Sequence, residues 1–236
     1  MRSLAVLRLL VVLVAGPALA GCAEKPRVTS AAPSGDASAP SGPPRYLALG
    51  DSFTIGTGGP PLAAFPARLV DRWREKGCVA ELENVAVNGY TTEDLVAKEL
   101  PSLATFKPTF VTIAIGANDI VHGSSLEAYR ANVKRILDAV AAAGASMVVV
   151  PQPDWSRSPI AASFGTQETL DASIRAFNEA LADEAKAHHA TFVDLAPLMR
   201  EQAAKKMIAN DGLHPSGEAY DAWAAELARV LPMPCR

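Results

Sequence analysis

The chain has 236 residues, of which 22 are Lys or Arg and 25 are Asp or Glu, so its formal net charge at neutral pH is −3. Because this slightly acidic chain, with an isoelectric point near 5.8, offers no basic footprint, nucleic acid is not expected as a partner. Aromatic residues make up only 6% of the chain, which suits closely packed helices better than an aromatic-lined sugar groove.

The first 21 residues have the pattern of an export signal. Arginines flank a short positive region, and the apolar run at 9–20 that follows is shorter than the roughly 20 residues a membrane-spanning helix needs. The run ends in Leu-Ala-Gly-Cys, which resembles a bacterial lipobox, whose Cys is lipidated and becomes the new N-terminus. We therefore expect a lipoprotein signal peptide at 1–21 and a lipid anchor on Cys22. The alternative is an ordinary signal peptide cleaved near Ala20.

The next segment, residues 22–44, carries the expected lipidated Cys and is otherwise rich in Ala, Ser, Pro and Gly, with Val28 as its one branched aliphatic residue. Such a segment cannot bury enough apolar surface to offset its ordering entropy, so it predicts a flexible tether. A small structured cap is the alternative, but no apolar periodicity supports it. The tether would hold one globular domain, residues 45–236, at the bacterial cell envelope.

Within that domain, short apolar runs alternate with amphipathic stretches. The runs predict strands buried on both faces of a parallel sheet at Tyr46–Leu49, Leu82–Val87, Phe110–Ile115, Met147–Val150 and Phe192–Asp194. The stretches with apolar residues at helical spacing predict helices at Phe65–Lys76, Thr92–Leu100, Leu126–Ala143, Glu168–Ala187 and Ser216–Val230. Repeated strand-helix units predict an α/β fold, a three-layer α/β/α sandwich around a parallel sheet.

Polar motifs gather at one edge of this predicted sheet. Three of them directly follow the first three strands: Gly50-Asp51-Ser52, Asn88-Gly89 and Gly116-Ala117-Asn118-Asp119. The turn from Asp211 to His214 precedes the last helix and can reach the same edge. Because ligands of such sheets bind outside the carboxyl ends of the strands, these four segments predict one site.

The chemistry of that site follows from three of its residues. A serine hydroxyl is a poor nucleophile unless an imidazole takes its proton and a carboxylate orients the imidazole. Ser52, His214 and Asp211 supply these three groups, which predicts a hydrolytic triad. No metal-binding motif is present in the sequence.

Other interpretations of the site residues stay open at this stage. Ser52 could cap the helix after the first strand, and Gly89 could be only a turn glycine. Asn118 could be a loop residue that satisfies its own backbone. The His214-Pro215 pair could mark the start of the last helix.

The four motifs, in this order and at these places, resemble the conserved blocks of the SGNH hydrolases, also called the GDSL esterase/lipase family. The resemblance spans nearly the whole domain and implies a five-stranded parallel sheet in flavodoxin-like order. It also implies hydrolysis of esters or thioesters without a metal or cofactor. By this resemblance Ser52 is the nucleophile, His214 the general base and acid, and Asp211 its orienting partner.

The resemblance further implies an oxyanion hole made by the backbone N–H groups of Ser52 and Gly89 and by the Asn118 side chain. Such donors stabilise the charge that the carbonyl oxygen gains in the tetrahedral intermediate. Asp51 and Asp119 are expected to fix the loop backbones by hydrogen bonds rather than to act in catalysis.

Three residues near the same edge are candidates for the substrate pocket. A Pro-Asp-Trp stretch after the fourth predicted strand resembles one found in some bacterial SGNH hydrolases, so Trp155 could wall the pocket and Arg157 could meet an anionic group. The alternative is a rigid connecting loop whose Trp packs on the core. His122 follows the third motif closely and is the remaining candidate.

The resemblance also bears on the two other cysteines, Cys78 and Cys235. In a flavodoxin-like arrangement the first and last helices lie side by side, and these residues follow the carboxyl ends of those helices, at the rim opposite the site. An exported chain meets oxidising conditions more often than a cytosolic one, so we expect a structural disulfide between them.

The expected protein is therefore a lipid-anchored, monomeric serine esterase that acts on small or short-chain esters through an acyl-enzyme. A carbohydrate O-acetylesterase, or a lysophospholipase or thioesterase of the same fold, is the alternative. A transferase that uses the same acyl-enzyme and a non-catalytic envelope lipoprotein are further possibilities.

Overall fold

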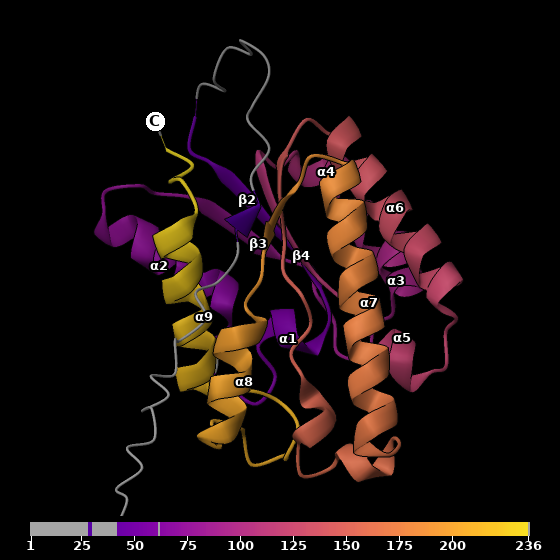
Figure 1. Cartoon of the computed structure of the whole chain (residues 1–236). Coiled ribbons are helices and arrows are strands. Elements are labelled where there is room, and N and C mark those ends of the chain that lie inside the picture. The colour runs from indigo at the N-terminus through magenta and orange to yellow at the C-terminus, as the bar shows by residue number, and fades with distance from the viewer. Residues whose placement is uncertain (1–27, 30–41, 61, 236) are drawn as a thin grey trace, which may run out of the picture.

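A six-stranded sheet in the order β1-β6-β5-β4-β2-β3 runs through the middle of the protein (Figure 1). The computed structural model describes residues 28–29, 42–60 and 62–235. The strands are β1 (Val28–Thr29), β2 (Arg45–Gly50), β3 (Glu81–Asn84), β4 (Phe110–Ala114), β5 (Ser146–Val149) and β6 (Thr191–Val193). Strands β2 to β6 pair in parallel, and their order is the expected flavodoxin-like one.

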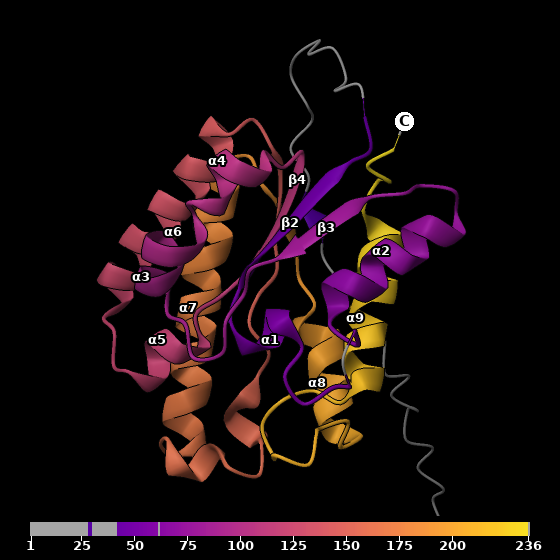
Figure 2. The same cartoon turned by 180° about the vertical axis from the view of Figure 1, so that it is seen from behind.

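Helices cover both faces of the sheet. Figures 1 and 2 show α2, α8 and α9 on one face and α3, α4, α6 and α7 on the other. The helices are α1 (Ser52–Ile55), α2 (Phe65–Glu75), α3 (Thr92–Asp94), α4 (Ser102–Phe106), α5 (Ala117–Val121), α6 (Leu126–Ala142), α7 (Gln167–Ala187), α8 (Ala196–Ala204) and α9 (Gly217–Val230). Three shorter segments are the π-helix η1 (Leu95–Glu99) and the 3₁₀ turns η2 (Trp155–Arg157) and η3 (Ala161–Ser163).

The alternation of side chains along β2 explains why both faces are covered. Tyr46 and Ala48 point into the core under α2 and α9, whereas Leu47 and Leu49 point into the core under α6 and α7. Because side chains of a strand alternate between faces, a continuous apolar run gives each face its own core. Burial on both faces holds the strand end that carries Ser52.

Side-chain caps set the start of the long helices. Ser125 accepts the Ala128 N–H at 3.1 Å before α6, and Thr166 accepts the Thr169 N–H at 3.3 Å before α7. Ser216 accepts the Ala219 N–H at 3.3 Å before α9. The alternative in which the His214-Pro215 pair begins the last helix is therefore wrong, since His214 lies outside α9 and its side chain remains available.

The predicted strands and long helices are confirmed with shifts of a few residues at their ends. The second predicted strand ends at Asn84, not Val87, yet the Val85 and Val87 N–H groups still donate to the Ala48 and Gly50 carbonyls of β2. The second predicted helix, 92–100, is α3 followed by a π-helix. Short helices α1, α4, α5 and α8 were not predicted.

The predicted tether at 22–44 needs one correction. Residues Val28–Thr29 form β1 and pair antiparallel with β6, so this part of the segment extends the sheet. A strand gains backbone hydrogen bonds from a sheet edge whatever its composition, which the argument from apolar content overlooked. The predicted signal peptide at 1–21, Cys22, and residues 30–41 lie outside the described residues. Among those described, no helix is both apolar and long enough to cross a bilayer.

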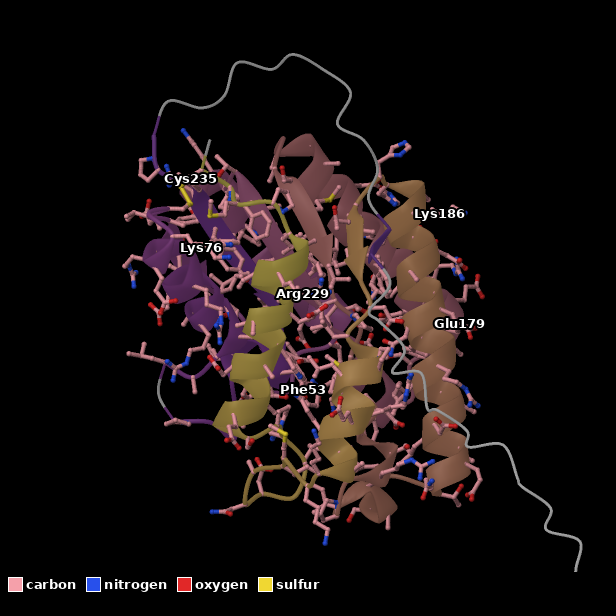
Figure 3. All side chains as sticks on the ribbon, turned by 60° about the vertical axis from the view of Figure 1, so that its left-hand side comes forward. Phe53, Lys76, Glu179, Lys186, Arg229 and Cys235 are labelled. Atoms are coloured by element: carbon pink, nitrogen blue, oxygen red, sulfur yellow. A yellow bond between two sulfur atoms is a disulfide. The ribbon has the colours of Figure 1, made fainter. Side chains whose placement is uncertain are left out.

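The predicted disulfide is confirmed. Cys78 and Cys235 are bonded, with their Cα atoms 5.5 Å apart, and the bond ties the end of α2 to the segment after α9. Figure 3 shows it toward the end of the molecule away from Phe53, which neighbours Ser52.

Candidate active site

Ser52 is the first residue of α1, directly after the central strand β2. The cap of this helix is Asp51, whose Oδ1 accepts the Phe53 N–H at 3.0 Å. The alternative in which Ser52 is the cap is therefore wrong, and its hydroxyl is not committed to the helix start. The Ser52 residue is 8% exposed, so the structure places a hydroxyl at the end of a rigid strand with limited access to water.

Asp211 and His214 form an acid–imidazole pair within one turn. His214 Nδ1 lies 2.8 Å from Asp211 Oδ2. Asp211 Oδ1 accepts the Leu213 and His214 N–H groups at 2.9 and 3.0 Å, which fixes the carboxylate plane. Partial burial pulls the pKa of Asp211 upward, but these three bonds outweigh it and lower the pKa. The carboxylate therefore stays ionised and holds the imidazole with Nε2 turned away from it.

The structure brings this turn against α1. The rings of Phe53 and His214 lie 5.3 Å apart, and the Tyr220 hydroxyl of α9 donates to the Thr57 carbonyl at 2.9 Å. Among the described residues, the hydrogen bond between His214 and Asp211 is formed, whereas none joins the Ser52 hydroxyl to the imidazole. Bonds of this kind are often long before substrate binds.

Two backbone N–H groups are available at the predicted oxyanion hole. Among the described residues, neither Ser52 nor Gly89 donates its N–H to a backbone or side-chain acceptor. Gly89 has φ of 81°, which favours glycine, and a Cβ there would meet no atom within 4 Å. The Gly89 backbone is therefore exposed to open space, as an N–H group that meets a substrate oxygen must be.

Hydrogen bonds tie the three predicted oxyanion segments together. Thr57, which follows α1, donates from its hydroxyl to the Asn88 side chain, next to Gly89. The Asn118 amide on α5 donates to the Tyr90 carbonyl at 3.0 Å, which holds Asn118 beside the same loop. The three predicted donors therefore belong to segments that contact one another.

Asp119 fixes the loop backbone, as predicted. Its carboxylate accepts the Thr92 N–H at 2.9 Å and the Thr92 hydroxyl at 2.5 Å, so it ties α5 to the start of α3. Burial raises the pKa of Asp119, and burial raises the pKa of Asp51 to about 7. Both groups serve the backbone of loops next to the site.

The three candidate pocket residues have different environments. Trp155 is buried; its indole N–H donates to Gln152 Oε1 at 3.1 Å and its ring meets Phe164 edge-on. Trp155 also lines a cavity of about 40 Å³ next to the His214 turn. Arg157 and His122 are exposed and do not line this cavity. Trp155 therefore packs on the core, as in the alternative interpretation, and also walls this cavity.

The cavity is mostly apolar and lies between α8, η2 and the turn of Asp211 and His214. Its walls include Phe53, Trp155, Met199, Met207, Leu213 and Trp223. The contribution of α8 was missed, since the sequence pattern marked residues 195–210 only as an intervening segment. A second missed residue is Glu99 on η1, whose carboxylate accepts the Gly50 N–H at 2.9 Å. Its place one helical turn after buried Leu95, on an apolar face, was a usable signal.

Comparisons with known proteins agree with this geometry. The sequence model of the GDSL-like Lipase/Acylhydrolase family matches residues 48–222. The chain is 29% identical over 188 residues to "Thioesterase 1/protease 1/lysophospholipase L1" of Escherichia coli, covering 78% of this chain and 82% of the relative. It is 26% identical over 187 residues to an arylesterase of Vibrio mimicus, covering 77% and 84%.

A likeness to a solved structure concerns the fold. The structure of an acetyl xylan esterase from Geobacillus stearothermophilus superposes with a TM-score of 0.66 at 19% identity, covering 79% of this chain and 93% of that one.

Proposed function

Because the chain belongs to the GDSL-like lipase/acylhydrolase family, we propose that it hydrolyses short-chain carboxylic esters through an acyl-enzyme on Ser52. The family and its relatives make the chain a carboxylic ester hydrolase. The observation that carries the roles of individual residues is the Asp211–His214 hydrogen bond of 2.8 Å, on a turn packed against the helix that begins with Ser52.

The proposed reaction has two halves. His214 Nε2 takes the Ser52 proton as Oγ attacks the ester carbonyl, and the imidazolium that forms is stabilised by ionised Asp211. The same imidazolium then protonates the leaving alcohol, which leaves an acyl group on Ser52. In the second half His214 activates a water molecule that attacks the acyl carbon, and the carboxylic acid departs.

The oxyanion donors act in both halves. The Ser52 and Gly89 N–H groups and the Asn118 amide would receive the negative charge that develops on the carbonyl oxygen. These donors sit in a fixed framework before the reaction, so little reorganisation is needed when the charge appears.

The size of the cavity supports a short acyl or alcohol group. At about 40 Å³, its volume is about three times the roughly 10–15 Å³ that one water molecule needs, which leaves room for a small group.

A second candidate function is hydrolysis of longer acyl chains, as in a lysophospholipase or thioesterase. The observation that favours it is the exposure of Ile55, Val87 and Val121, which are 39%, 40% and 40% exposed and lie next to the three site segments in the sequence. A carbohydrate O-acetylesterase is compatible with the small cavity, and acetylated sugars therefore belong in the substrate test.

The test is a series of p-nitrophenyl esters, from acetyl to palmitoyl, with acetylated sugars measured beside it. We expect kcat/KM to be highest between acetyl and butyryl, and Ser52→Ala to abolish turnover of every ester. Met199→Ala, which enlarges the cavity, should shift the preference toward longer chains. Equal turnover by wild type and Ser52→Ala would overturn the proposal, and an optimum at palmitoyl would favour the second candidate.

We also propose that the protein is exported, lipid-anchored on Cys22 after removal of residues 1–21, and monomeric. The Cys78–Cys235 disulfide supports export, because structural disulfides persist in oxidising compartments. Residues 22–44 would link the anchor to the hydrolase domain at 45–236. Mass spectrometry of the mature protein tests the anchor: we expect a lipidated N-terminal Cys22, and an unmodified Cys22 would exclude it.

A further inference from the structure

Glu99 is a buried carboxyl group that the proposed reaction does not use. It ends the π-helix η1 and is 1% exposed. Its Oε2 accepts the Gly50 N–H at 2.9 Å, while its Oε1 is buried and, among the described residues, has no hydrogen-bond partner. Burying a carboxyl group without a full set of partners is costly, so its burial two residues before Pro101 calls for a reason.

The bonded group, Gly50, is the last residue of β2 and stands two residues before the nucleophile. A parallel sheet would pair it on the β3 side, but β3 ends at Asn84, which pairs with Ala48. Gly50 has φ of 154°, and a Cβ there would lie 2.3 Å from both the Ala114 carbonyl oxygen and the Thr54 hydroxyl. Its backbone is thus held in one conformation by close neighbours, and Glu99 replaces the missing strand partner.

The peptide groups of Gly50 connect the segments of two proposed oxyanion donors, Ser52 and Gly89. Its carbonyl accepts the Val87 N–H at 3.3 Å, two residues before Gly89. Its N–H, held by Glu99, precedes the turn that aims the Ser52 N–H and hydroxyl. A rotation at Gly50 would therefore displace the nucleophile and two of the three oxyanion donors together.

From these contacts we propose that Glu99 is a positioning residue for catalysis: its carboxyl group holds the Gly50 N–H and thereby fixes the turn that carries Ser52. This role rests on the proposed function of Ser52. The role of Glu99 adds to that function, because it assigns part of the catalytic geometry to a residue on η1 that touches neither substrate nor the triad.

The surroundings of Glu99 indicate that it works in the neutral form. Burial raises the pKa of Glu99 to about 8, and the nearby acids Asp51, after β2, and Asp94, on α3, add to the rise. Asp119 acts in turn on Asp51. On α6, burial raises the pKa of Tyr129 well above the usual value, and the nearby acids Asp119 and Asp51 add to the rise. Ionisation of Glu99 above neutral pH would therefore place a second negative charge beside Asp51 and disturb the turn that carries Ser52.

Two variants of Glu99 separate positioning from simple support of the fold. Glu99→Gln is neutral and keeps an oxygen that can accept the Gly50 N–H, whereas Glu99→Leu keeps the approximate size and loses the acceptor. We expect Glu99→Gln to keep wild-type kcat on p-nitrophenyl acetate at pH 7. We expect Glu99→Leu to lose about 10²-fold in kcat with little change in KM, since a displacement of about 1 Å at a reacting group has an effect of that order.

A matched control is Thr112→Val, which removes a fully buried hydroxyl of β4 that bonds to the Tyr46 hydroxyl at 2.8 Å. It should lower the melting temperature and leave kcat unchanged. The role of Glu99 is overturned if folded Glu99→Leu turns over like wild type, or if Glu99→Gln loses as much kcat as Glu99→Leu.

The pH profile gives a readout that does not require Glu99→Leu to fold. Wild type should lose kcat as the pH rises through about 8, and Glu99→Gln should keep it over the same range. Identical alkaline limbs for the two proteins would contradict the proposal. Ser52→Ala is measured in parallel: if it is as active as wild type, the proposed function and the role of Glu99 both fail, whereas a silent Ser52→Ala with unaffected Glu99 variants refutes the role of Glu99 alone.

Discussion

Removal of the disulfide should destabilise the protein strongly without affecting catalysis. The bond joins residues 157 apart in sequence, Cys78 and Cys235. For a loop of that length the entropy removed from the unfolded chain corresponds to about 5 kcal/mol at 25 °C, near the upper end of measured effects. The folded state keeps its other contacts, because α2 and α9 also pack through Trp73 and Trp223 in one apolar cluster.

The assay is urea unfolding of wild type and of the double variant Cys78→Ala/Cys235→Ala, followed by tryptophan fluorescence. With a urea slope of about 2 kcal/mol per M, a loss of about 5 kcal/mol lowers the midpoint by about 2.5 M. The esterase kcat at 25 °C should stay unchanged, because the bond lies at the end of the sheet opposite Ser52. Wild type with a reductant that opens the bond is the matched control. Coincident midpoints for oxidised wild type and the double variant would refute the reasoning.

Three further predictions concern the site. Asp211→Asn should lower kcat on p-nitrophenyl acetate by about 10³- to 10⁴-fold, because the amide favours the wrong imidazole tautomer. Asn118→Ala should lower kcat in the same assay by about 10²- to 10³-fold with little change in KM, because it removes one oxyanion donor. Glu99→Gln should raise the melting temperature at pH 8 and change it little at pH 4.5, measured by differential scanning calorimetry. The pKa of Glu99 is raised from 4.5 to about 8 on folding, so its contribution to stability is present below pH 4.5 and lost as the pH rises to about 8.

Each of these has an outcome that contradicts it. For Asp211→Asn the control is Asp221→Asn, which breaks the partly exposed ion pair with Arg72 and should leave kcat unchanged; equal kcat in both variants argues against an orienting role. A rise in KM alone in Asn118→Ala would mean that the amide binds the ground state as well as the transition state. A melting temperature of Glu99→Gln that exceeds wild type equally at both pH values would exclude titration as the cause.

The sequence predicted the fold well because its strongest signals are local. The apolar runs that became β2, β4 and β5 are short and bounded by loops, and those of β4 and β5 contain β-branched residues. The long helices α6 and α7 carry clear apolar spacing. Helices such as α1 and α5 are one turn long, so no periodicity can reveal them.

The site was predictable only in part, for a related physical reason. Asp211 and His214 lie on one turn, so their pairing follows from a separation of three residues. The bond between Glu99 and Gly50 joins residues 49 apart, and the cavity wall on α8 depends on how the segment after β6 folds back. Contacts of this kind arise from tertiary packing. The strand β1 is a similar case, because it pairs through its backbone and leaves no mark in side-chain pattern.

The central claim is that Ser52 is the nucleophile activated by His214. The most direct test is to react the protein with a fluorophosphonate, which bonds covalently to activated serines, and to identify the modified peptide by mass spectrometry. We expect stoichiometric modification at Ser52 in wild type and a rate reduced by several orders of magnitude in His214→Ala. Modification of a different residue, or equal rates in the two proteins, would contradict it.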